Sequence, residues 1–554
     1  MKVLKGIAGS PGIAMAPIVF YRKSTGEGVS LSLEEARQNC IQRVGQLHEK
    51  ALQETGGEEA KIFEAYEMLL QDEFLFSPAA SAIEGGAEPV QAVLEAAETM
   101  SRVLASKGSE YMRQRADDIR YVGEMVANEM KGEQSHYTLP EGDTPFLLVA
   151  HELTPVDTMK FDSDRLAGLV TQLGGATSHT VILAKSLGIP AVVGVKGIEF
   201  SEKSLNGALD GYLGEFVIDP DLQTEVVYQD KIKEEEALQA RMDSIKTMPA
   251  QTKDGQRISV LANIGNPMDL KYAEGLQYDG VGLFRSEFLY LKEDKKPTVQ
   301  KQAEAYQKAI DKAELVTIRT LDIGGDKQIS YLSMEEEENP FLGNRGIRLC
   351  LHHQQLFREQ LEAILIAAAG KKVHIMLPMI TSITEISQAK ALLNEVKEKL
   401  EQNHTPYCAD AALGIMIETP ASAIMADQFA KYCDFFSVGT NDLIQYLLCA
   451  DRGNAQVEYL YNPFHPAVIQ MLYQVIQAGE KAGIPVSVCG DMAADLRFTK
   501  LLLGLGLKKF SVPFPMIARM KYKISTISLQ DAQALAQKVL QEEQEQQIQN
   551  LLKE

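Results

Sequence analysis

The stretch Phe435-Phe436-Ser437-Val438-Gly439-Thr440-Asn441-Asp442 decides the fold, because a short apolar run stands directly before a polar turn. Apolar runs of this length are typical of strands that are buried on both faces of a parallel sheet. The amide and the carboxylate that follow are groups that bind ligands or metals. The stretch therefore predicts a buried strand whose carboxyl end carries functional side chains.

Similar apolar runs recur from about residue 249 onward and alternate with helical stretches. The predicted strands are Ser259–Ile264, Gly280–Phe284, Val316–Leu321, Val373–Pro378, Leu413–Ile417, Phe435–Val438, Val486–Val488 and Phe510–Val512. Eight such strands predict a (β/α)₈ TIM-type barrel, although a doubly wound sheet would show the same alternation. The closed barrel is favoured because functional side chains follow so many of the strands, namely Arg285, Arg319, Glu418, Asn441, Asp442 and Cys489.

The first half of the chain has a different pattern. A strand at Ala16–Tyr21 is followed by helical stretches that begin with the capping box Ser32-Leu33-Glu34-Glu35 and continue near 59–75, 90–105 and 110–131. Short β-rich runs then return at 145–149, 166–171, 191–195 and 207–219. We therefore expect an α/β multidomain protein with an α/β domain of residues 1–22 and 133–228, a helical insert at 23–132, a linker helix at 229–248 and the barrel at 249–554.

One histidine stands at a glycine-led junction between a loop and a helix, in Gly174-Gly175-Ala176-Thr177-Ser178-His179-Thr180. The glycines allow a sharp turn, Thr177 and Ser178 can cap, and the apolar residues from Val181 onward predict a short helix. The first turn of a helix favours an anion, so His179 is well placed to carry a phosphoryl group. A histidine of the capping region with no chemical role would show the same local pattern.

Composition limits the classes of function. The 554 residues are 45% hydrophobic and 24% charged, as in soluble globular proteins, and a soft expectation of about 150 residues per domain suggests three or four domains. The net charge of −21 argues against nucleic acid and permits a basic protein partner, although it also serves solubility. We expect neither a signal peptide nor membrane insertion. The six scattered cysteines predict a cytoplasmic location.

The residues at the predicted strand ends suit a phosphorylated carboxylate. Guanidinium groups match carboxylate and phosphate oxygens, and the candidates for substrate binding are Arg285, Arg319, Arg345 and Arg452. Each could instead form a structural ion pair. Glu418 and Asp442 suit Mg²⁺, while the alternatives are an indirect supporting role for Glu418 and helix capping for Asp442. Asn441 and Lys327 can meet a phosphoryl group, and Asp322 and Asp326 can orient the cations.

Several motifs together resemble enzyme I of the bacterial sugar phosphotransferase system. They cover nearly the whole chain in one order, and the joint occurrence is more specific than any single motif. The matching segments are Gly174–Gly194, Gly280–Phe288, Arg319–Lys327, Asn339–Arg345, Glu418–Pro420, Gly439–Leu443 and Cys489–Gly490.

The resemblance implies roles for particular residues. His179 would attack the phosphorus of phosphoenolpyruvate through Nε2, Cys489 would protonate the enolpyruvate that becomes pyruvate, and Glu418 and Asp442 would hold Mg²⁺. A packing role for Cys489 is the alternative. The substrate would lie against Arg285, Arg319, Arg345, Asn441, Arg452 and Lys327, and the phosphohistidine would be supported by Thr158, Gly174, Gly175, Thr177 and Ser178.

The same resemblance implies that the histidine domain swivels between the barrel and a small histidine phosphocarrier protein called HPr. The helical insert would dock HPr through residues such as Glu67, Met68, Asp72 and Glu73, although Met68 could be a core residue and the acids a solvated helix face. A homodimer formed through the barrel is also implied. Pyruvate phosphate dikinase and phosphoenolpyruvate synthase are the nearest enzymatic alternatives, but they need an ATP-binding domain that we do not find, and a nitrogen-related regulatory paralogue stays open.

The chain departs from the family pattern near both parts of the expected site. Ala176 and Lys185 stand where arginine is common, so positive charge near the phosphohistidine is lost or altered. Asp491 replaces the usual glutamate, and Asn344 stands where tryptophan is often found. We expect slower transfer or a less stabilised phosphohistidine from the first two departures.

Overall fold

The structure is a computed structural model that describes residues 1–554 apart from 25–30, 55–57, 106–109, 133, 154, 159, 176–177, 202–204, 292–294, 325–328, 330, 333–336, 455 and 554. The chain forms two compact units, Met1–Leu238 and Gln239–Glu554. Outside these gaps, none of the helices has both the length and the apolar character that crossing a membrane requires.

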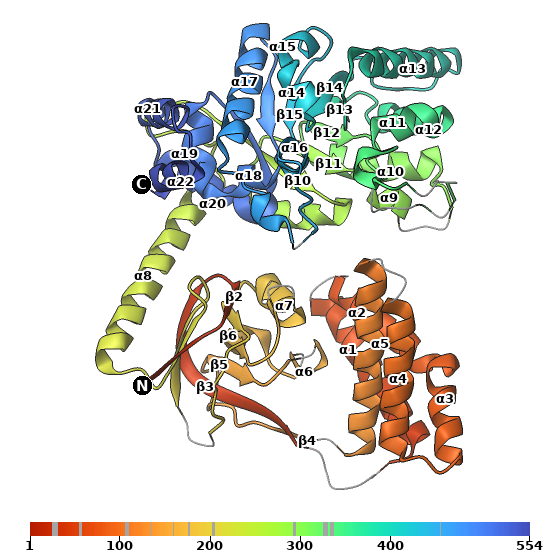
Figure 1. Ribbon diagram of the computed structural model, residues 1–554, viewed down its shortest axis with the longest axis vertical. Helices are drawn as coiled ribbons and strands as arrows, with labels where there is room; N and C mark the ends of the chain where they lie inside the picture. Colours follow the sequence, from red (N-terminus) through yellow and green to blue (C-terminus); the bar gives the residue numbers. More distant parts are fainter. Residues whose placement is uncertain are drawn as a thin grey trace. The chain divides into compact units, whose positions relative to one another are not determined.

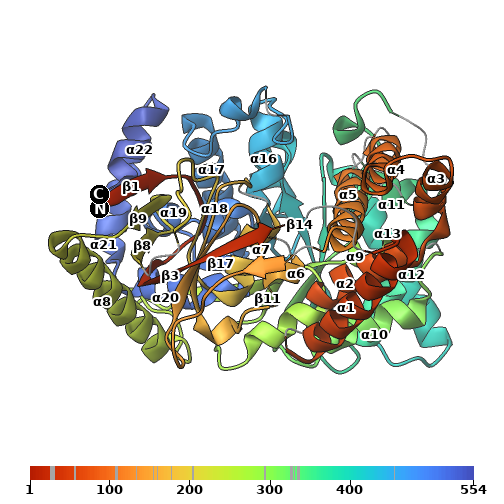
Figure 2. The same cartoon turned by 90° about the horizontal axis from the view of Figure 1, so that it is seen from below.

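The first unit contains a nine-stranded mixed sheet in the order β1-β9-β8-β3-β5-β6-β7-β2, with β4 paired to β3. The strands are β1 (Lys2–Lys5), β2 (Ile7–Ser10), β3 (Ile13–Ser24), β4 (Gln134–His136), β5 (Phe146–Ala150), β6 (Leu166–Thr171), β7 (Ala191–Val193), β8 (Asn206–Asp210) and β9 (Glu215–Ile218). Strand β3, the long red arrow in Figure 2, pairs in parallel with β5 and antiparallel with β8. Segments from before and after the helical insert therefore share one sheet.

The helices that begin in the first unit form a bundle and four further segments, of which the last, α8, continues into the second unit. They are α1 (Leu33–Glu54), α2 (Glu58–Gln71), α3 (Glu73–Glu84), α4 (Pro89–Ala105), α5 (Glu110–Met130), α6 (Pro155–Thr158), the 3₁₀ helix η1 (Ser163–Arg165), α7 (His179–Leu187) and α8 (Leu222–Ile245). The bundle α1–α5 is seen in Figure 1. The predicted capping box is present, since Ser32 N donates to Glu35 Oε2 at 3.0 Å and Glu35 N donates to Ser32 Oγ at 3.3 Å.

The bundle corrects one prediction. The stretch near 59–75 was expected to be a single helix, but α2 ends at Gln71 and α3 begins at Glu73. The cause is Asp72, whose Oδ1 accepts a hydrogen bond from Phe74 N at 2.9 Å and so caps a new helix. A capping aspartate at this point ends the continuous apolar periodicity.

The second unit is built on a closed barrel of eight parallel strands, β10 to β17, so the predicted TIM-type barrel is confirmed. The strands are β10 (Ser259–Ile264), β11 (Val281–Arg285), β12 (Val316–Arg319), β13 (Val373–Leu377), β14 (Ala412–Ile417), β15 (Phe436–Val438), β16 (Val486–Val488) and β17 (Lys509–Pro513). Strand β17 pairs in parallel with β10 and closes the ring. Figure 1 shows these strands enclosed by helices such as α13 and α17.

The remaining elements of this unit surround the barrel or lie in its loops. They are η2 (Pro267–Ala273), α9 (Phe288–Leu291), α10 (Val299–Ile310), η3 (Pro340–Leu342), α11 (Ile347–His352), α12 (Gln354–Ala367), α13 (Ile383–Gln402), α14 (Pro420–Ile424), α15 (Ala426–Phe429), α16 (Thr440–Leu447), η4 (Glu458–Leu460), α17 (Pro466–Ala482), α18 (Asp491–Ala494), α19 (Leu496–Gly504), α20 (Phe514–Ser525), α21 (Leu529–Val539) and α22 (Glu545–Lys553). Most of the apolar core lies between these helices and the strands.

Inside the barrel lies a small apolar floor, which we define as Leu283, Met376, Met416, Phe435 and Cys489. All five side chains are buried. Met416 Sδ lies 3.7 Å from Arg319 Nη1, so the floor meets the charged residues at the strand ends directly.

Lys521 on α20 fastens the segment that follows α8 to the barrel. Its Nζ donates to the carbonyls of Lys246 at 3.0 Å and Met248 at 2.7 Å, to the carbonyl of Gln277, and to Gln277 Oε1 at 2.8 Å. Burial lowers the pKa of Lys521 to about 8. The oxygen atoms around it satisfy the ammonium group of this residue, which is 1% exposed.

Candidate active site at the barrel mouth

The ends of the parallel strands bring the predicted site residues of the barrel to one rim. Since parallel strands all point the same way, residues at their carboxyl ends lie around one opening. Arg285 and Arg319 are the last residues of β11 and β12, Glu418 and Cys489 directly follow β14 and β16, and Asn441 and Asp442 lie in the first turn of α16, after β15.

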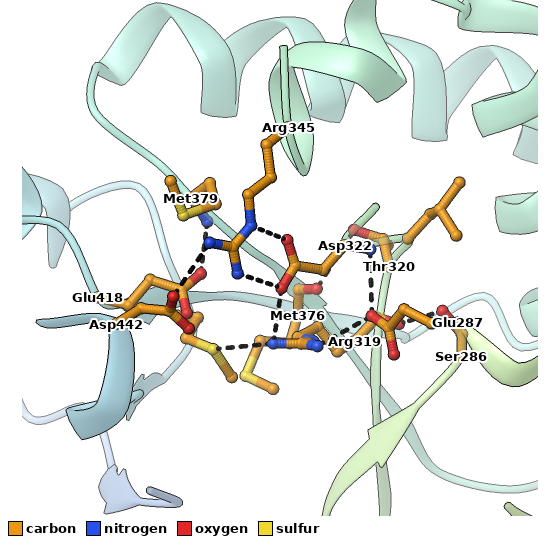
Figure 3. A network of polar contacts seen from close by, with 12 residues as sticks. Ser286, Glu287, Arg319, Thr320, Asp322, Arg345, Met376, Met379, Glu418 and Asp442 are labelled. Carbon is orange, nitrogen blue, oxygen red and sulfur yellow. Dashed lines mark hydrogen bonds and ion pairs between the residues drawn. The ribbon is translucent and has the colours of Figure 1, made fainter. Parts of the chain in front are cut away.

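Asp322 links two of the predicted arginines. Its carboxylate receives Arg345 Nε at 2.9 Å on Oδ1, and on Oδ2 it receives Arg345 Nη2 and Arg319 Nη1, each at 3.0 Å. Figure 3 shows Asp322 between the two guanidinium groups. The three side chains are nearly buried, at 2 to 9% exposure. The prediction that Asp322 orients the arginines is confirmed by this geometry.

Glu287 holds the other side of Arg319. Its Oε1 accepts from Arg319 Nη2 at 2.9 Å and from Asp322 N at 3.1 Å. Burial alone lowers the pKa of Arg319, but Glu287 and Asp322 raise it above the ordinary value, so the guanidinium stays charged. Its Nε is buried and has no hydrogen-bond partner among the described residues. Arg319 is thus fixed in place and keeps one donor unused.

Arg345 connects Asp322 to the expected metal carboxylates. Its Nη1 donates to Asp442 Oδ1 and to Tyr446 Oη, at 3.0 and 3.1 Å. This contact explains why Asp442 is only 8% exposed although it follows a strand end. The N-cap position of α16 is Gly439, so the alternative that Asp442 caps this helix is wrong.

Glu418 is fully buried, and one of its two carboxylate oxygens has no hydrogen-bond donor among the described residues. The residue is 0% exposed, its Oε1 accepts from Met379 N at 2.7 Å, and its Oε2 is buried without a partner in the described part of the chain. Burial and the nearby Asp442 carboxylate raise the pKa of Glu418 to about 8. A buried carboxylate oxygen without a hydrogen-bond donor fits a cation, since Arg319 and Arg345 offset only part of the effect of burial on Glu418.

The donor set matches a hard cation that takes few protein ligands. Glu418 and Asp442 supply oxygen atoms only, and Mg²⁺ completes its octahedron with water and substrate oxygens. No group of three or more His, Cys, Asp or Glu side chains that could hold a metal occurs among the described residues. The residues present therefore fit Mg²⁺ better than a metal that needs a full protein cage.

Asn441 forms two hydrogen bonds with Asp491, the residue that stands where the family usually has glutamate. Its Nδ2 donates to Asp491 Oδ2 at 2.9 Å, and its Oδ1 accepts from Asp491 N at 2.8 Å. Asp491 therefore fixes the orientation of the amide. Gly490 directly precedes Asp491. A Cβ on this glycine would lie 1.9 Å from Oγ1 of Thr440, the first residue of α16, so no larger residue fits here.

Arg285 and Arg452 differ from the other two arginines, because both are exposed. Among the described residues, no carboxylate forms an ion pair with either guanidinium group. Arg452 N donates to Gln445 Oε1 at 3.3 Å, and its side chain lies beside Tyr461, whose pKa burial raises to about 12. These two cations are available to an anionic ligand.

Cys489 lies on the apolar floor, below the rim. The residue is 4% exposed, and its Sγ donates to Val438 O at 3.5 Å. Burial raises the pKa of the Cys489 thiol to about 11, so the thiol keeps its proton at neutral pH. A protonated thiol is a weak nucleophile and still has a proton to give.

His179 begins helix α7 in the first unit, apart from the barrel. Ser178 is the N-cap residue, but its Oγ makes no capping bond and is buried without a partner among the described residues, so the prediction that its hydroxyl caps the helix is wrong. Gly174 has φ +105°, which only glycine adopts readily. Helix α6, which ends at the buried Thr158, packs against α7.

Some predicted residues lie outside the described residues or elsewhere in the first unit. Lys327, Asp326, Thr177 and Ala176 are outside the described residues, while Gly175 and the exposed Lys185 are within them. Met68 is 69% exposed, so the alternative that it is a core residue is wrong. The acids of the predicted HPr-docking face are in three settings: Glu67 lies 3.6 Å from His48 Nδ1, Asp72 caps α3, and Glu73 is in its first turn.

Sequence reasoning missed Glu287, Tyr446 and the amide of Met379. Glu287 lies two residues after Arg285, in a quoted motif, and an acid so close to a strand-end arginine was a usable signal. Tyr446 and Met379 reach the site only through tertiary contacts. No local pattern identifies those two.

Comparison with known proteins agrees with this geometry. Family models described as "PEP-utilising enzyme, PEP-binding domain", "PEP-utilising enzyme, mobile domain" and "PEP-utilising enzyme, N-terminal" match residues 239–529, 142–214 and 5–115. The phosphoenolpyruvate-protein phosphotransferase of Bacillus subtilis strain 168 is 39% identical over 98% of this chain and 97% of its own length. The chain belongs to the family of phosphoenolpyruvate-protein phosphotransferases.

Further relatives give the same result. Phosphoenolpyruvate-protein phosphotransferases of Listeria monocytogenes and Staphylococcus aureus strain MRSA252 are 40% and 38% identical, each over 97% of this chain. The two matches cover 96% of the Listeria protein and 97% of the Staphylococcus protein. The resemblance to enzyme I that the motifs predicted is therefore confirmed.

The shared carboxylate generates a stability prediction. Asp322→Asn leaves two buried guanidinium groups without their common partner, and we expect the unfolding free energy of the barrel unit to fall by about 3 kcal/mol. Asp495→Asn is the control, because Asp495 also pairs with an arginine through two nitrogens, but Arg497 is 62% exposed. That control should cost less than about 1 kcal/mol. Equal losses in urea unfolding of the two variants would contradict the central role of Asp322.

Proposed function

We propose that the chain carries out the reaction of its family with phosphoenolpyruvate bound at the barrel mouth and His179 as the carrier of the phosphoryl group. From His179 the group passes to a histidine of the phosphocarrier protein HPr, the first step of the sugar phosphotransferase system. The observation that carries the proposal is the rim of four arginines, two carboxylates and a buried thiol around one opening. These groups match a substrate that bears both a carboxylate and a phosphate.

The arginines divide the work of binding. Arg285 and Arg452 are exposed and take the oxygen atoms of the substrate directly. Arg319 adds its unused Nε, while its other nitrogens stay on Glu287 and Asp322. Arg345 is occupied by Asp322 and Asp442, so it organises the site more than it binds substrate. This arrangement supplies positive charge that is already oriented before substrate arrives.

Mg²⁺ held by Glu418 and Asp442 would neutralise charge on the phosphate oxygens. Asn441 donates an amide hydrogen to the same oxygens without adding charge, since Asp491 uses only one of its two N–H groups. Phosphoryl transfer depends on positioning and charge stabilisation more than on covalent help from the protein. The rim provides both.

Chemistry at the two ends of the substrate involves two residues. His179 Nε2 attacks phosphorus, the bond from phosphorus to the enol oxygen breaks, and enolpyruvate leaves. Carbon 3 of enolpyruvate then takes the proton of Cys489 Sγ and becomes the methyl group of pyruvate. Water returns a proton to the thiolate. A thiol with a pKa of about 11 is fully protonated when the reaction begins.

We also propose that HPr binds the helical bundle. The histidine domain swivels between the barrel and the helical bundle, where the exposed Met68 and the acids Glu67, Asp72 and Glu73 meet HPr. The net charge of −21 suits a basic partner. We further propose a homodimer formed through the barrel and a cytoplasmic location.

The nucleophile can be tested by replacement. His179→Ala should abolish labelling of the protein by phosphoenolpyruvate while binding of phosphoenolpyruvate stays near that of the parent, because the substrate site lies in the other unit. The amount of acid-labile, base-stable label measures the phosphohistidine. Isothermal titration calorimetry measures the binding of phosphoenolpyruvate. His136→Ala, on strand β4 of the same unit, should label normally. A stable labelled product from His179→Ala would rule out the assignment.

The metal site is best tested at Glu418, because Asp442 also holds Arg345. Glu418→Gln keeps an acceptor for Met379 N and removes the charge, so the Mg²⁺ concentration for half-maximal pyruvate formation should rise at least about tenfold. Stability should change little, since the pKa of about 8 leaves the parent carboxyl largely protonated at neutral pH without metal. Glu385→Gln, a helix-capping acid after β13, is the control. An unchanged Mg²⁺ midpoint in Glu418→Gln would exclude this ligand.

Cys489→Ala separates proton donation from packing. Loss of a general acid should slow pyruvate formation by about a hundredfold or more, with binding of phosphoenolpyruvate retained. Cys433→Ala removes another buried barrel thiol, away from the rim, and should keep normal turnover. Near-parental steady-state pyruvate production by Cys489→Ala, with excess carrier protein present, would show that the thiol only packs.

A further inference from the structure

A second polar network lies behind strands β11 and β12, on the outer side of the barrel. Its centre is Gln360 on α12, a side chain that is 1% exposed. An amide buried between a barrel strand and its covering helix is costly unless its hydrogen bonds are made. The burial of the Gln360 amide therefore has to be compensated by the groups that it contacts.

Gln360 uses both ends of its amide on the segments that form the mouth. Its Oε1 accepts from Leu321 N at 2.9 Å, and its Nε2 donates to Ser286 Oγ at 2.9 Å and to Tyr306 Oη at 3.1 Å. Leu321 directly precedes Asp322, and Ser286 directly follows Arg285. One side chain thus ties together the ends of two neighbouring strands.

Ser286 completes a ring of contacts around Arg319. Its Oγ donates to Arg319 O at 2.8 Å, so Gln360 reaches the Arg319–Leu321 segment from both sides, at Leu321 directly and at Arg319 through Ser286. The guanidinium of Arg319 is meanwhile held by Glu287 and Asp322. The backbone and the side chain of Arg319 are fixed by separate groups.

The end of β12 explains why the hydrogen bonds of Gln360 are needed. Thr320 N still donates to Met376 O on β13 at 2.9 Å, but β12 has ended at Arg319 and the next amide finds no strand partner. Gln360 satisfies that amide and defines the direction in which the chain leaves the strand. A fully satisfied buried network specifies one arrangement of the groups that it joins.

We propose that Gln360 is a positioning residue for the reaction with phosphoenolpyruvate. It touches no substrate and acts through the backbone that carries Arg319 and Asp322, and through Ser286 beside Arg285. The inference rests on the proposed function, in which phosphoenolpyruvate lies against these arginines. Small displacements of such groups have large effects on rate, because they reduce alignment in the transition state.

Gln360→Met tests this role, since methionine has similar length and no amide. We expect kcat/KM for phosphoenolpyruvate to fall about tenfold or more per folded molecule. Gln302→Met is the matched control: Gln302 is 0% exposed, and its amide joins Tyr290 Oη at 2.7 Å and Pro297 O at 3.1 Å without reaching β12. It should lower the melting temperature to a similar degree and leave kcat/KM near that of the parent.

A conservative variant supplies a readout that a merely structural role would not move. Gln360→Glu, in its protonated form, keeps an acceptor for Leu321 N and one donor for Ser286. Activity should therefore be partly retained at low pH and should fall as the introduced carboxyl ionises, a step in the pH profile that the parent lacks. This variant and Ser286→Ala also keep the inference testable if Gln360→Met does not fold.

The outcomes separate the inference from the function on which it rests. A kcat/KM near that of the parent in Gln360→Met would overturn the positioning role. If Gln360→Met does not fold, the same result in both Gln360→Glu and Ser286→Ala would overturn it. Equal kinetic losses in Gln360→Met and Gln302→Met would do the same. Arg319→Ala should lose nearly all activity; if it does not, the placement of phosphoenolpyruvate at this arginine fails, whatever Gln360 does.

Discussion

The barrel mouth depends on one carboxylate that is shared by two buried arginines. Asp322 fixes Arg319 and Arg345 together, and through Arg345 it also fixes Asp442, one of the proposed metal ligands. Burying so many charges is unfavourable unless each is paired with good geometry. The pairing lets the rim hold dense charge in one arrangement, and it makes the substrate side and the metal side of the site parts of a single network.

Pairing also distinguishes two kinds of arginine that look alike in the sequence. Arg319 and Arg345 are nearly buried and held by acids, whereas Arg285 and Arg452 are exposed and have no carboxylate partner among the described residues. The first two are held in one orientation by these acids. The other two are available to an anionic ligand, and in the proposed function they meet the substrate directly.

Strand positions could be predicted because buried parallel strands leave short apolar runs, and all eight barrel strands begin and end within two residues of the expected positions. The rim residues at strand ends followed from the same pattern. Their partners did not, because Gln360, Tyr446 and the amide of Met379 reach the site through the fold alone. The break at Asp72 was missed since one capping residue outweighed helical periodicity.

The apolar floor has a consequence for the thiol after the proposed reaction. Leu283, Met376, Met416 and Phe435 are buried together with Cys489. A thiolate in these surroundings is poorly solvated, and burial raises the pKa of the group. If Cys489 gives its proton to carbon 3 of enolpyruvate, the resulting thiolate is therefore a strong base. The surroundings that hold the proton before the reaction also favour its return afterwards, so the floor restores the acid for the next cycle.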